Sequence, residues 1–156
     1  MTKWHVPLML AVGLLLAADS PEGTITKEKE QLSGTWNVVS VEANGKRIPA
    51  EAIKDFQYIF TADSATRKKG GKAESGAGYQ LDPSKSPKWM DMTGTTDGKA
   101  RAIPGLYQLD GDTLTLCFRT DYKKGGKVNE VQKRPEKLDG SDGSEQVLMV
   151  LTRETP

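Results

Sequence analysis

Short runs in which apolar and polar residues alternate recur along most of the chain, and they predict β-strands. In Phe56–Phe60 aromatic residues alternate with other residues, and in Thr113–Arg119 three apolar side chains fall on one face. Further runs of this kind are Trp36–Val41, Thr66–Lys69, Ser75–Leu81, Trp89–Thr93, Ala102–Leu109 and Val147–Thr152. About eight short strands at this spacing predict an all-β fold, an antiparallel sandwich or barrel.

Turn residues separate several of these runs. Asn44-Gly45 follows the first run, and Leu109–Thr113 contains the most evident hairpin turn of the chain. The run Thr66–Lys69 is short and charged, so we expect an edge strand there. Pro104 predicts an edge or a bulge where its strand begins, because proline cannot donate to a ladder.

The remaining segments predict little regular structure. Thr26–Leu32 favours a short helix with Thr26 as its N-cap, and Pro49 opens a helical turn that extends through Ile53. Residues 19–25 are polar and contain proline and glycine, which indicates a flexible lead-in. Residues 120–144 are polar and rich in glycine and lysine, so we expect a long loop with a weak strand near Val128–Val131.

The first residues have the pattern of an export signal. Lys3 supplies a positive start, Val6–Ala18 is almost entirely apolar, and Asp19 ends the apolar stretch. This stretch is too short to cross a hydrocarbon core of about 30 Å as a helix. A secretory signal peptide is therefore favoured over a buried N-terminal helix, and after its removal no membrane span is expected. No cysteine lies near the boundary, which argues against a lipid anchor.

Cleavage after Ala18 fits the preference for a small residue, and cleavage after Ser20 is the weaker alternative because Pro21 would follow. We divide the chain into a signal peptide (1–18), a flexible lead-in with the start of the helix (19–29) and a barrel domain (30–156). The predicted location is the periplasm, the cell envelope or the medium.

Composition narrows the chemistry. The chain has 156 residues, enough for one domain, with 22 basic and 21 acidic residues. Lys3 is the only charged residue before Asp19, so the mature chain would carry equal numbers of both signs. This balance argues against nucleic-acid binding through a general basic field. His5 is the only histidine and would leave with the signal peptide, which removes histidine-based triads and metal sites.

No phosphate-binding loop or dinucleotide motif is present, and we expect no cofactor, no metal and no catalytic residues. A non-enzymatic protein is therefore favoured. Cys117 is interpreted as a small buried side chain on the face opposite Leu116 and Phe118, rather than as a reactive thiol. Asp91 is a strand aspartate that would face solvent or cap a loop rather than hold a hydroxyl ligand.

Two basic clusters contain adjacent glycines, Arg67–Lys72 and Lys123–Lys127. Each is favoured as a charged edge or loop that prevents strand pairing. A contact with an anionic polymer, such as a cell-surface polysaccharide, is the alternative.

A longer pattern of residues resembles a known family. Gly34-x-Trp36 at the start of the first strand resembles the Gly-x-Trp signature of lipocalin barrels, in which an arginine near the end of the last strand packs on the tryptophan. Arg153 is placed to match that arginine. The pattern continues through Asn44-Gly45-Lys46 and Gly105-x-Tyr107-x-Leu109-Asp110-Gly111-Asp112, and ends at Val147-Leu148-x-Val150-Leu151-x-Arg153.

Over roughly residues 30–154 the chain is similar to a lipocalin-like domain family that is abundant in planctomycete bacteria and has no assigned activity. This resemblance implies export and a small antiparallel barrel of about eight strands that follows a short helical segment. It supplies no catalytic residues. Gly34, Trp36 and Arg153 form its structural signature.

Two interpretations of function remain open. In the first, the barrel holds a small apolar ligand, lined by Tyr58, Phe60, Tyr79, Met92, Tyr107, Leu116 and Phe118. In the second, these side chains fill the barrel, and the protein is a structural module or binds a protein or polysaccharide through its surface. The volume left inside the barrel distinguishes the two.

Overall fold

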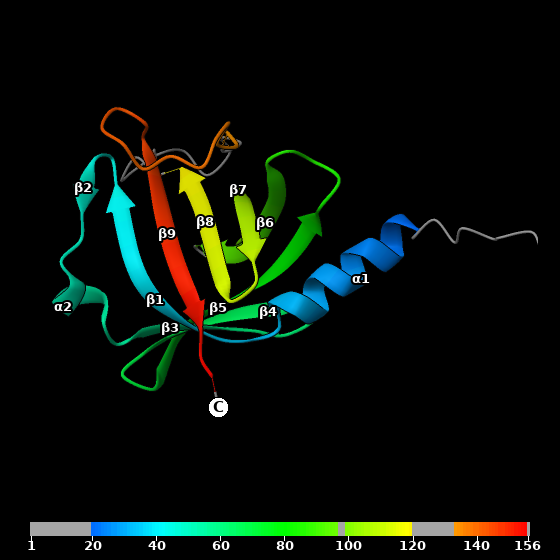
Figure 1. The fold of residues 1–156 in the computed structure, drawn as a ribbon, viewed down its shortest axis with the longest axis horizontal. Helices are drawn as coiled ribbons and strands as arrows, with labels where there is room; N and C mark the ends of the chain where they lie inside the picture. The colour runs from blue at the N-terminus through cyan, green and yellow to red at the C-terminus, as the bar shows by residue number, and fades with distance from the viewer. Residues whose placement is uncertain (1–19, 97–98, 120–132, 156) are drawn as a thin grey trace, which may run out of the picture.

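The computed structural model describes residues 20–96, 99–119 and 133–155. The expected signal peptide, the basic cluster Lys123–Lys127 and the weak strand near Val128–Val131 lie outside these residues. The elements in chain order are α1 (Pro21–Leu32), β1 (Gly34–Ala43), β2 (Lys46–Arg47), α2 (Ala50–Ile53), β3 (Phe56–Phe60), β4 (Ser64–Lys69), β5 (Lys72–Asp82), β6 (Lys88–Thr96), β7 (Lys99–Asp110), β8 (Thr113–Arg119) and β9 (Gln146–Arg153) (Figure 1).

The strands form a closed antiparallel barrel, as the sequence predicts. From β3 to β9 each strand pairs with the next, β1 pairs with β3, and β1 also pairs with β9. This last pairing closes an eight-stranded barrel, and the short β2 adds a hairpin to β1. Asn44 and Gly45, with φ of 49° and 77°, form the turn of that hairpin. The helical turn α2 ends at Ile53 as expected, but it begins at Ala50, with Pro49 as its N-cap rather than its first residue.

The N-terminal helix is longer than the sequence suggested. It begins at Pro21, so the part of the expected lead-in from Pro21 to Ile25 is helical, and its N-cap is Ser20 rather than Thr26. The Ser20 hydroxyl accepts a hydrogen bond from the backbone N–H of Gly23 at 3.1 Å. The Pro21 ring suits the first helical position, where no N–H is needed. Figure 1 shows α1 leaving the barrel at the end where β1 starts and β9 finishes.

The structure tests the two strand edges that the sequence predicts. β4 pairs along its length with β3 and β5, so the charged run Thr66–Lys69 is not an edge strand. β7 pairs with both β6 and β8, and Pro104 lies opposite Asp91 without a bulge. The ladder between β7 and β8 covers only Gly105–Asp110, so Pro104 lies just beyond its end, where a missing N–H breaks no bond to β8.

Trp36 and Arg153 close the α1 end of the barrel. Trp36 is fully buried, and its indole N–H donates to the carbonyl oxygen of Leu32, the last residue of α1, at 2.8 Å. The Arg153 guanidinium lies over the Trp36 ring, 4.2 Å from its centroid, and donates to the carbonyl oxygens of Ser33 and Gln31. The guanidinium therefore satisfies backbone oxygens around the end of α1 while it covers the indole.

The segment 133–145 covers part of the outer wall. Arg134 forms a two-pronged ion pair with Asp91, at 2.5 and 3.0 Å, and donates to the Gly105 carbonyl oxygen. Cys117 is fully buried on the outer face beneath this segment, as the sequence predicts, and burial raises the pKa of its thiol. The buried Gln146 amide turns its nitrogen toward the carbonyl oxygens of Lys137 and Asp139, at 2.9 and 3.2 Å. Asp91 therefore anchors a loop.

Candidate functional site

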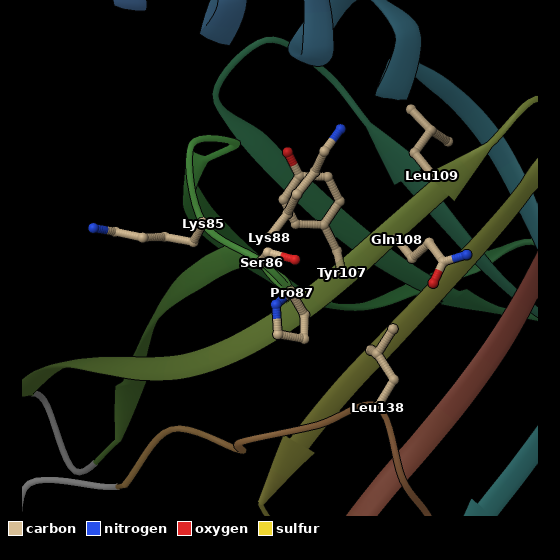
Figure 2. Close-up of a pocket in the computed structure, with 8 residues that line it drawn as sticks. All are labelled: Lys85, Ser86, Pro87, Lys88, Tyr107, Gln108, Leu109 and Leu138. Carbon is tan, nitrogen blue, oxygen red and sulfur yellow. The ribbon is translucent and has the colours of Figure 1, made fainter.

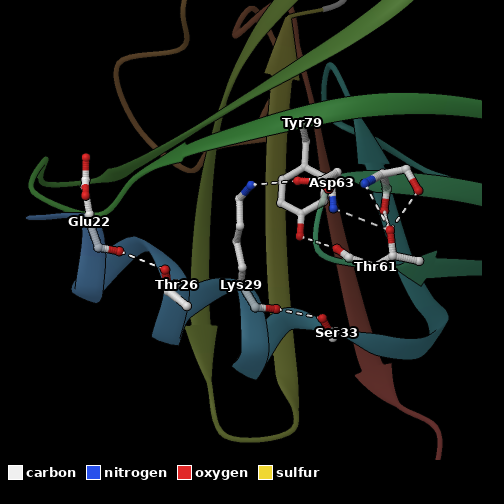
Figure 3. A network of polar contacts seen from close by, with 8 residues as sticks. Glu22, Thr26, Lys29, Ser33, Thr61, Asp63 and Tyr79 are labelled. Carbon is white, nitrogen blue, oxygen red and sulfur yellow. Dashed lines mark hydrogen bonds and ion pairs between the residues drawn. The ribbon is translucent and has the colours of Figure 1, made fainter.

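Polar side chains hold α1 against the barrel (Figure 3). Lys29 lies over the ring of Tyr79, 5.4 Å from its centroid, and its ammonium is 3.5 Å from the Asp63 carboxylate. The Tyr79 hydroxyl donates to the carbonyl oxygen of Thr61 at 2.6 Å. These contacts involve α1, the β3–β4 turn and β5, and they fix the helix over the α1 end of the barrel.

A second group of polar side chains joins α1 to β6 and β7. The carboxylate of Glu28 accepts a hydrogen bond from the Tyr107 hydroxyl at 3.0 Å and forms an ion pair with Lys88. Burial and the Glu28 charge raise the pKa of Tyr107, because both disfavour the phenolate. Glu28 was not singled out from the sequence, because nothing in the pattern of α1 shows which strand its carboxylate meets.

A pocket lies beside this group, where the β5–β6 loop meets β7 (Figure 2). Its volume is about 230 Å³, and its lining comes from the β5–β6 loop, from the first residue of β6, from β7 and from Leu138. Lys85 points away from β7 in Figure 2, and its ammonium lies over the Trp89 ring. Pockets for small molecules usually hold roughly 300–1,000 Å³. This one is smaller, and its Lys88 already pairs with Glu28, so it is a weak candidate for a binding site.

The predicted barrel-lining residues divide into two groups. Phe60, Tyr79, Tyr107, Leu116 and Phe118 are buried in the hydrophobic core. Tyr58 and Met92 are only partly buried and pack against that core. The structure therefore brings all seven together on the inner face, but leaves only two of them partly exposed.

Exposure of the inner face increases with distance from α1. On β9, Leu151 is fully buried whereas Met149 and Val147 are partly exposed. The same change occurs from Phe60 to Tyr58 on β3. It recurs between Met90 and Met92 on β6, between Tyr107 and Ile103 on β7, and between Val38 and Val41 on β1. We call the half of the inner face that contains Val41, Phe56, Tyr58, Met92, Ile103, Val147 and Met149 the distal half.

Basic side chains also reach the distal half. Arg67 lies opposite Tyr58 and Lys69 opposite Phe56, and directly opposite residues share a face of the sheet. The Arg67 guanidinium and the Lys69 ammonium lie 5.6 and 5.1 Å from the centroid of the Phe56 ring. The sequence interpretation placed this basic cluster on an edge, which is wrong, because β4 is an interior strand with these two side chains on its inner face.

We expect the protein to lose stability at high pH, because three of its tyrosines have raised pKa values. Burial raises the pKa of Tyr79 from 10.0 to about 12, and it also raises the pKa values of Tyr58 and Tyr107. In the unfolded chain these phenols ionise at lower pH than in the folded chain. The free energy of unfolding should therefore stay level up to about pH 9 and fall from pH 10 toward pH 12.

Urea denaturation between pH 8 and 12 measures this fall. Tyr79→Phe should make it shallower, whatever stability the variant loses at pH 8 with its bond to Thr61. An unchanged slope in Tyr79→Phe would show that the Tyr79 phenol ionises equally easily in both states.

Within the described part of the chain, no group of three or more His, Cys, Asp or Glu side chains is arranged to hold a metal ion. None of the helices in that part combines the length and the apolar character needed to cross a membrane. Comparison with protein-family models, with curated proteins and with solved structures finds no match to the chain.

Proposed function

We propose that the protein is an exported binding protein that holds one small apolar ligand in the distal half of its barrel. The α1 half is filled by its own side chains, so the ligand contacts Tyr58 and Met92, together with their distal neighbours, rather than all seven predicted residues. Export and membership of the lipocalin-like family are parts of the same proposal, which the Gly34, Trp36 and Arg153 signature supports.

One observation carries this proposal. On five strands the inner side chains change from buried near α1 to partly exposed toward the opposite end. Some apolar side chains face inward and still meet solvent. A ligand that covers them lowers the free energy of the complex by about 25 cal/mol for each Å² of apolar surface removed from water. The Tyr58 hydroxyl and the inward basic side chains add the few polar groups that usually orient a ligand.

The helix cap supports the expected cleavage site. Cleavage after Ala18 leaves Ser20, whose hydroxyl caps α1, whereas cleavage after Ser20 removes the cap. Loss of a serine cap costs about 1 kcal/mol. Because α1 supplies Glu28 and Leu32 to the barrel end, a mature chain that begins at Asp19 is the better folded product. The intact mass of the exported protein tests this directly.

Binding is tested with the neutral apolar dye Nile red and the mature protein. We expect one dye molecule to bind each protein molecule. Met92→Gln and Ile103→Gln should each weaken dye affinity about three- to tenfold. The two residues are neighbours on the paired strands β6 and β7, and each change places an amide against the dye. Val39→Gln is the matched control, because Val39 is 48% exposed and points away from the core. It should leave the affinity unchanged.

Native mass spectrometry of the exported protein, with lipid extraction of the same sample, then identifies the natural ligand. No dye uptake and an apo mass would contradict the proposal. They would favour the second interpretation, a filled barrel that contacts a protein or polysaccharide through its surface.

A further inference from the structure

Basic side chains from separate strands share the distal half of the inner face. Arg67 and Lys69 come from β4, and Arg101 comes from β7, two residues beyond the inward-facing Ile103. Around the barrel, β4 and β7 are separated by β5 and β6 in one direction and by β8, β9, β1 and β3 in the other. The arginines therefore extend inward from different walls of the barrel.

Both arginines keep buried donors without partners. The Nε–H groups of Arg67 and Arg101 are shielded from solvent and donate to no acceptor among the described residues. A buried donor that lacks an acceptor costs free energy, and most proteins avoid it. Two such donors on one inner face indicate that an acceptor is brought by something that binds there.

The charges nearby do not balance. Glu74 lies 3.1 Å from the Arg67 guanidinium and neutralises one cation, and the Tyr58 hydroxyl lies beside the same group. Within the described part of the chain, Arg101 has no ion pair and Lys69 has only the Phe56 ring. Among the described side chains of the distal half, the cations therefore outnumber Glu74, and this excess of positive charge favours a negatively charged ligand.

From this arrangement we propose that the ligand is an amphiphile with an oxyanion head group and a short apolar chain. The inference rests on the proposed function and adds the class of ligand. Arg67 and Arg101 bind the head group, since the guanidinium fork matches two oxygens of a carboxylate, sulfate or phosphate. The partly exposed Met92, Ile103 and Met149 contact the chain.

Calorimetric titration with three matched probes tests the proposal. Decanoate and decyl sulfate share a ten-carbon chain with the neutral decanol and differ from it in the head group. Wild-type protein should bind at least one of the two anions about tenfold or more tightly than decanol, and their order distinguishes a carboxylate site from a sulfate- or phosphate-type site.

Arg101→Gln removes the charge that has no partner and leaves a shorter, neutral polar side chain. It should weaken binding of the preferred anion about tenfold and leave decanol affinity unchanged. Arg47→Gln is the control, because Arg47 is an exposed arginine of β2 that contacts Ser40. It should change neither affinity. Circular dichroism confirms that each variant is folded.

The outcomes separate the two proposals. Equal affinity of the wild-type protein for decanol and both anions would overturn the head-group inference. Equal weakening of anion and decanol binding by Arg101→Gln would overturn it as well. In both cases the proposal of ligand binding would stand. No binding of any probe, together with no uptake of Nile red, overturns the proposed function itself.

Discussion

Replacing Trp36 with alanine is expected to lower the free energy of unfolding by about 3–5 kcal/mol. The indole is fully buried, so its removal leaves a cavity and takes apolar surface out of the core. The Leu32 carbonyl oxygen loses its donor, and the Arg153 guanidinium loses the ring over which it lies. Equilibrium urea denaturation followed by circular dichroism measures the change.

Trp89→Ala is the matched control for this change. Trp89 lies on the outer face, with the Arg134 guanidinium 4.1 Å from the ring centroid and the Lys85 ammonium at 4.9 Å. It is only partly buried, so its loss should cost about 1–2 kcal/mol. Trp36→Phe, which keeps the ring but loses the donor, should fall between the two. Equal losses in Trp36→Ala and Trp89→Ala would show that Trp36 does not hold the barrel end together.

Local pattern was enough to predict the strands, because each strand has one face in the core. Phe56–Phe60 and Thr113–Arg119 are found with the predicted bounds, and the other predicted strands extend further at one or both ends. Closure of the barrel depends on pairing between Trp36–Ala43 of β1 and β9. These segments are far apart in the chain, so periodicity alone left a sandwich and a barrel as alternatives, and the family resemblance decided between them.

The basic side chains show why the candidate site was only partly predicted. Charge on a short strand usually marks an edge, and the pattern around Arg67 and Lys69 predicts an edge for that reason. Their inward orientation follows from their register with Tyr58 and Phe56, and the sequence does not specify that register. Arg101 does not belong to a basic cluster in the sequence, so the sequence does not indicate it as a site residue. It nevertheless continues the alternation of Ile103 and Tyr107 on β7.

The polar contacts of α1 were missed for a related reason. The helix was predicted from its last turns, because Thr26 is an acceptable cap and proline with glycine indicates a loop. Ser20 followed by Pro21 was the signal that would have placed its start correctly. The partners of Glu28 are Lys88 and Tyr107, which are distant in the chain and meet it only after the barrel has closed.

Gly105→Ala is the second substitution for which we expect a large effect, a loss of about 2–3 kcal/mol in the free energy of unfolding. A Cβ atom at Gly105 would lie 2.2 and 2.5 Å from two ring carbons of Phe118, the residue opposite it on β8, and 3.0 Å from the Cys117 carbonyl oxygen. The Phe118 ring is 7% exposed and packed in the core, so it has little room to move away. Urea denaturation measures the loss.

Gly94→Ala is the control, because it changes a glycine in the neighbouring strand β6 where no atom lies within 4 Å of an added Cβ. It should be neutral or stabilising by about 0.4–1 kcal/mol, since alanine restricts the unfolded chain more than glycine does. If the clash with the ring causes the loss at Gly105, then adding Phe118→Leu should recover part of it, and the double variant should be more stable than the sum of the single losses predicts. Additive losses would instead place the cost in the backbone of β7. The distinction matters for the distal half, because the Phe118 ring lies over Gly105 two residues from Ile103, where the proposed ligand begins its contact with the barrel.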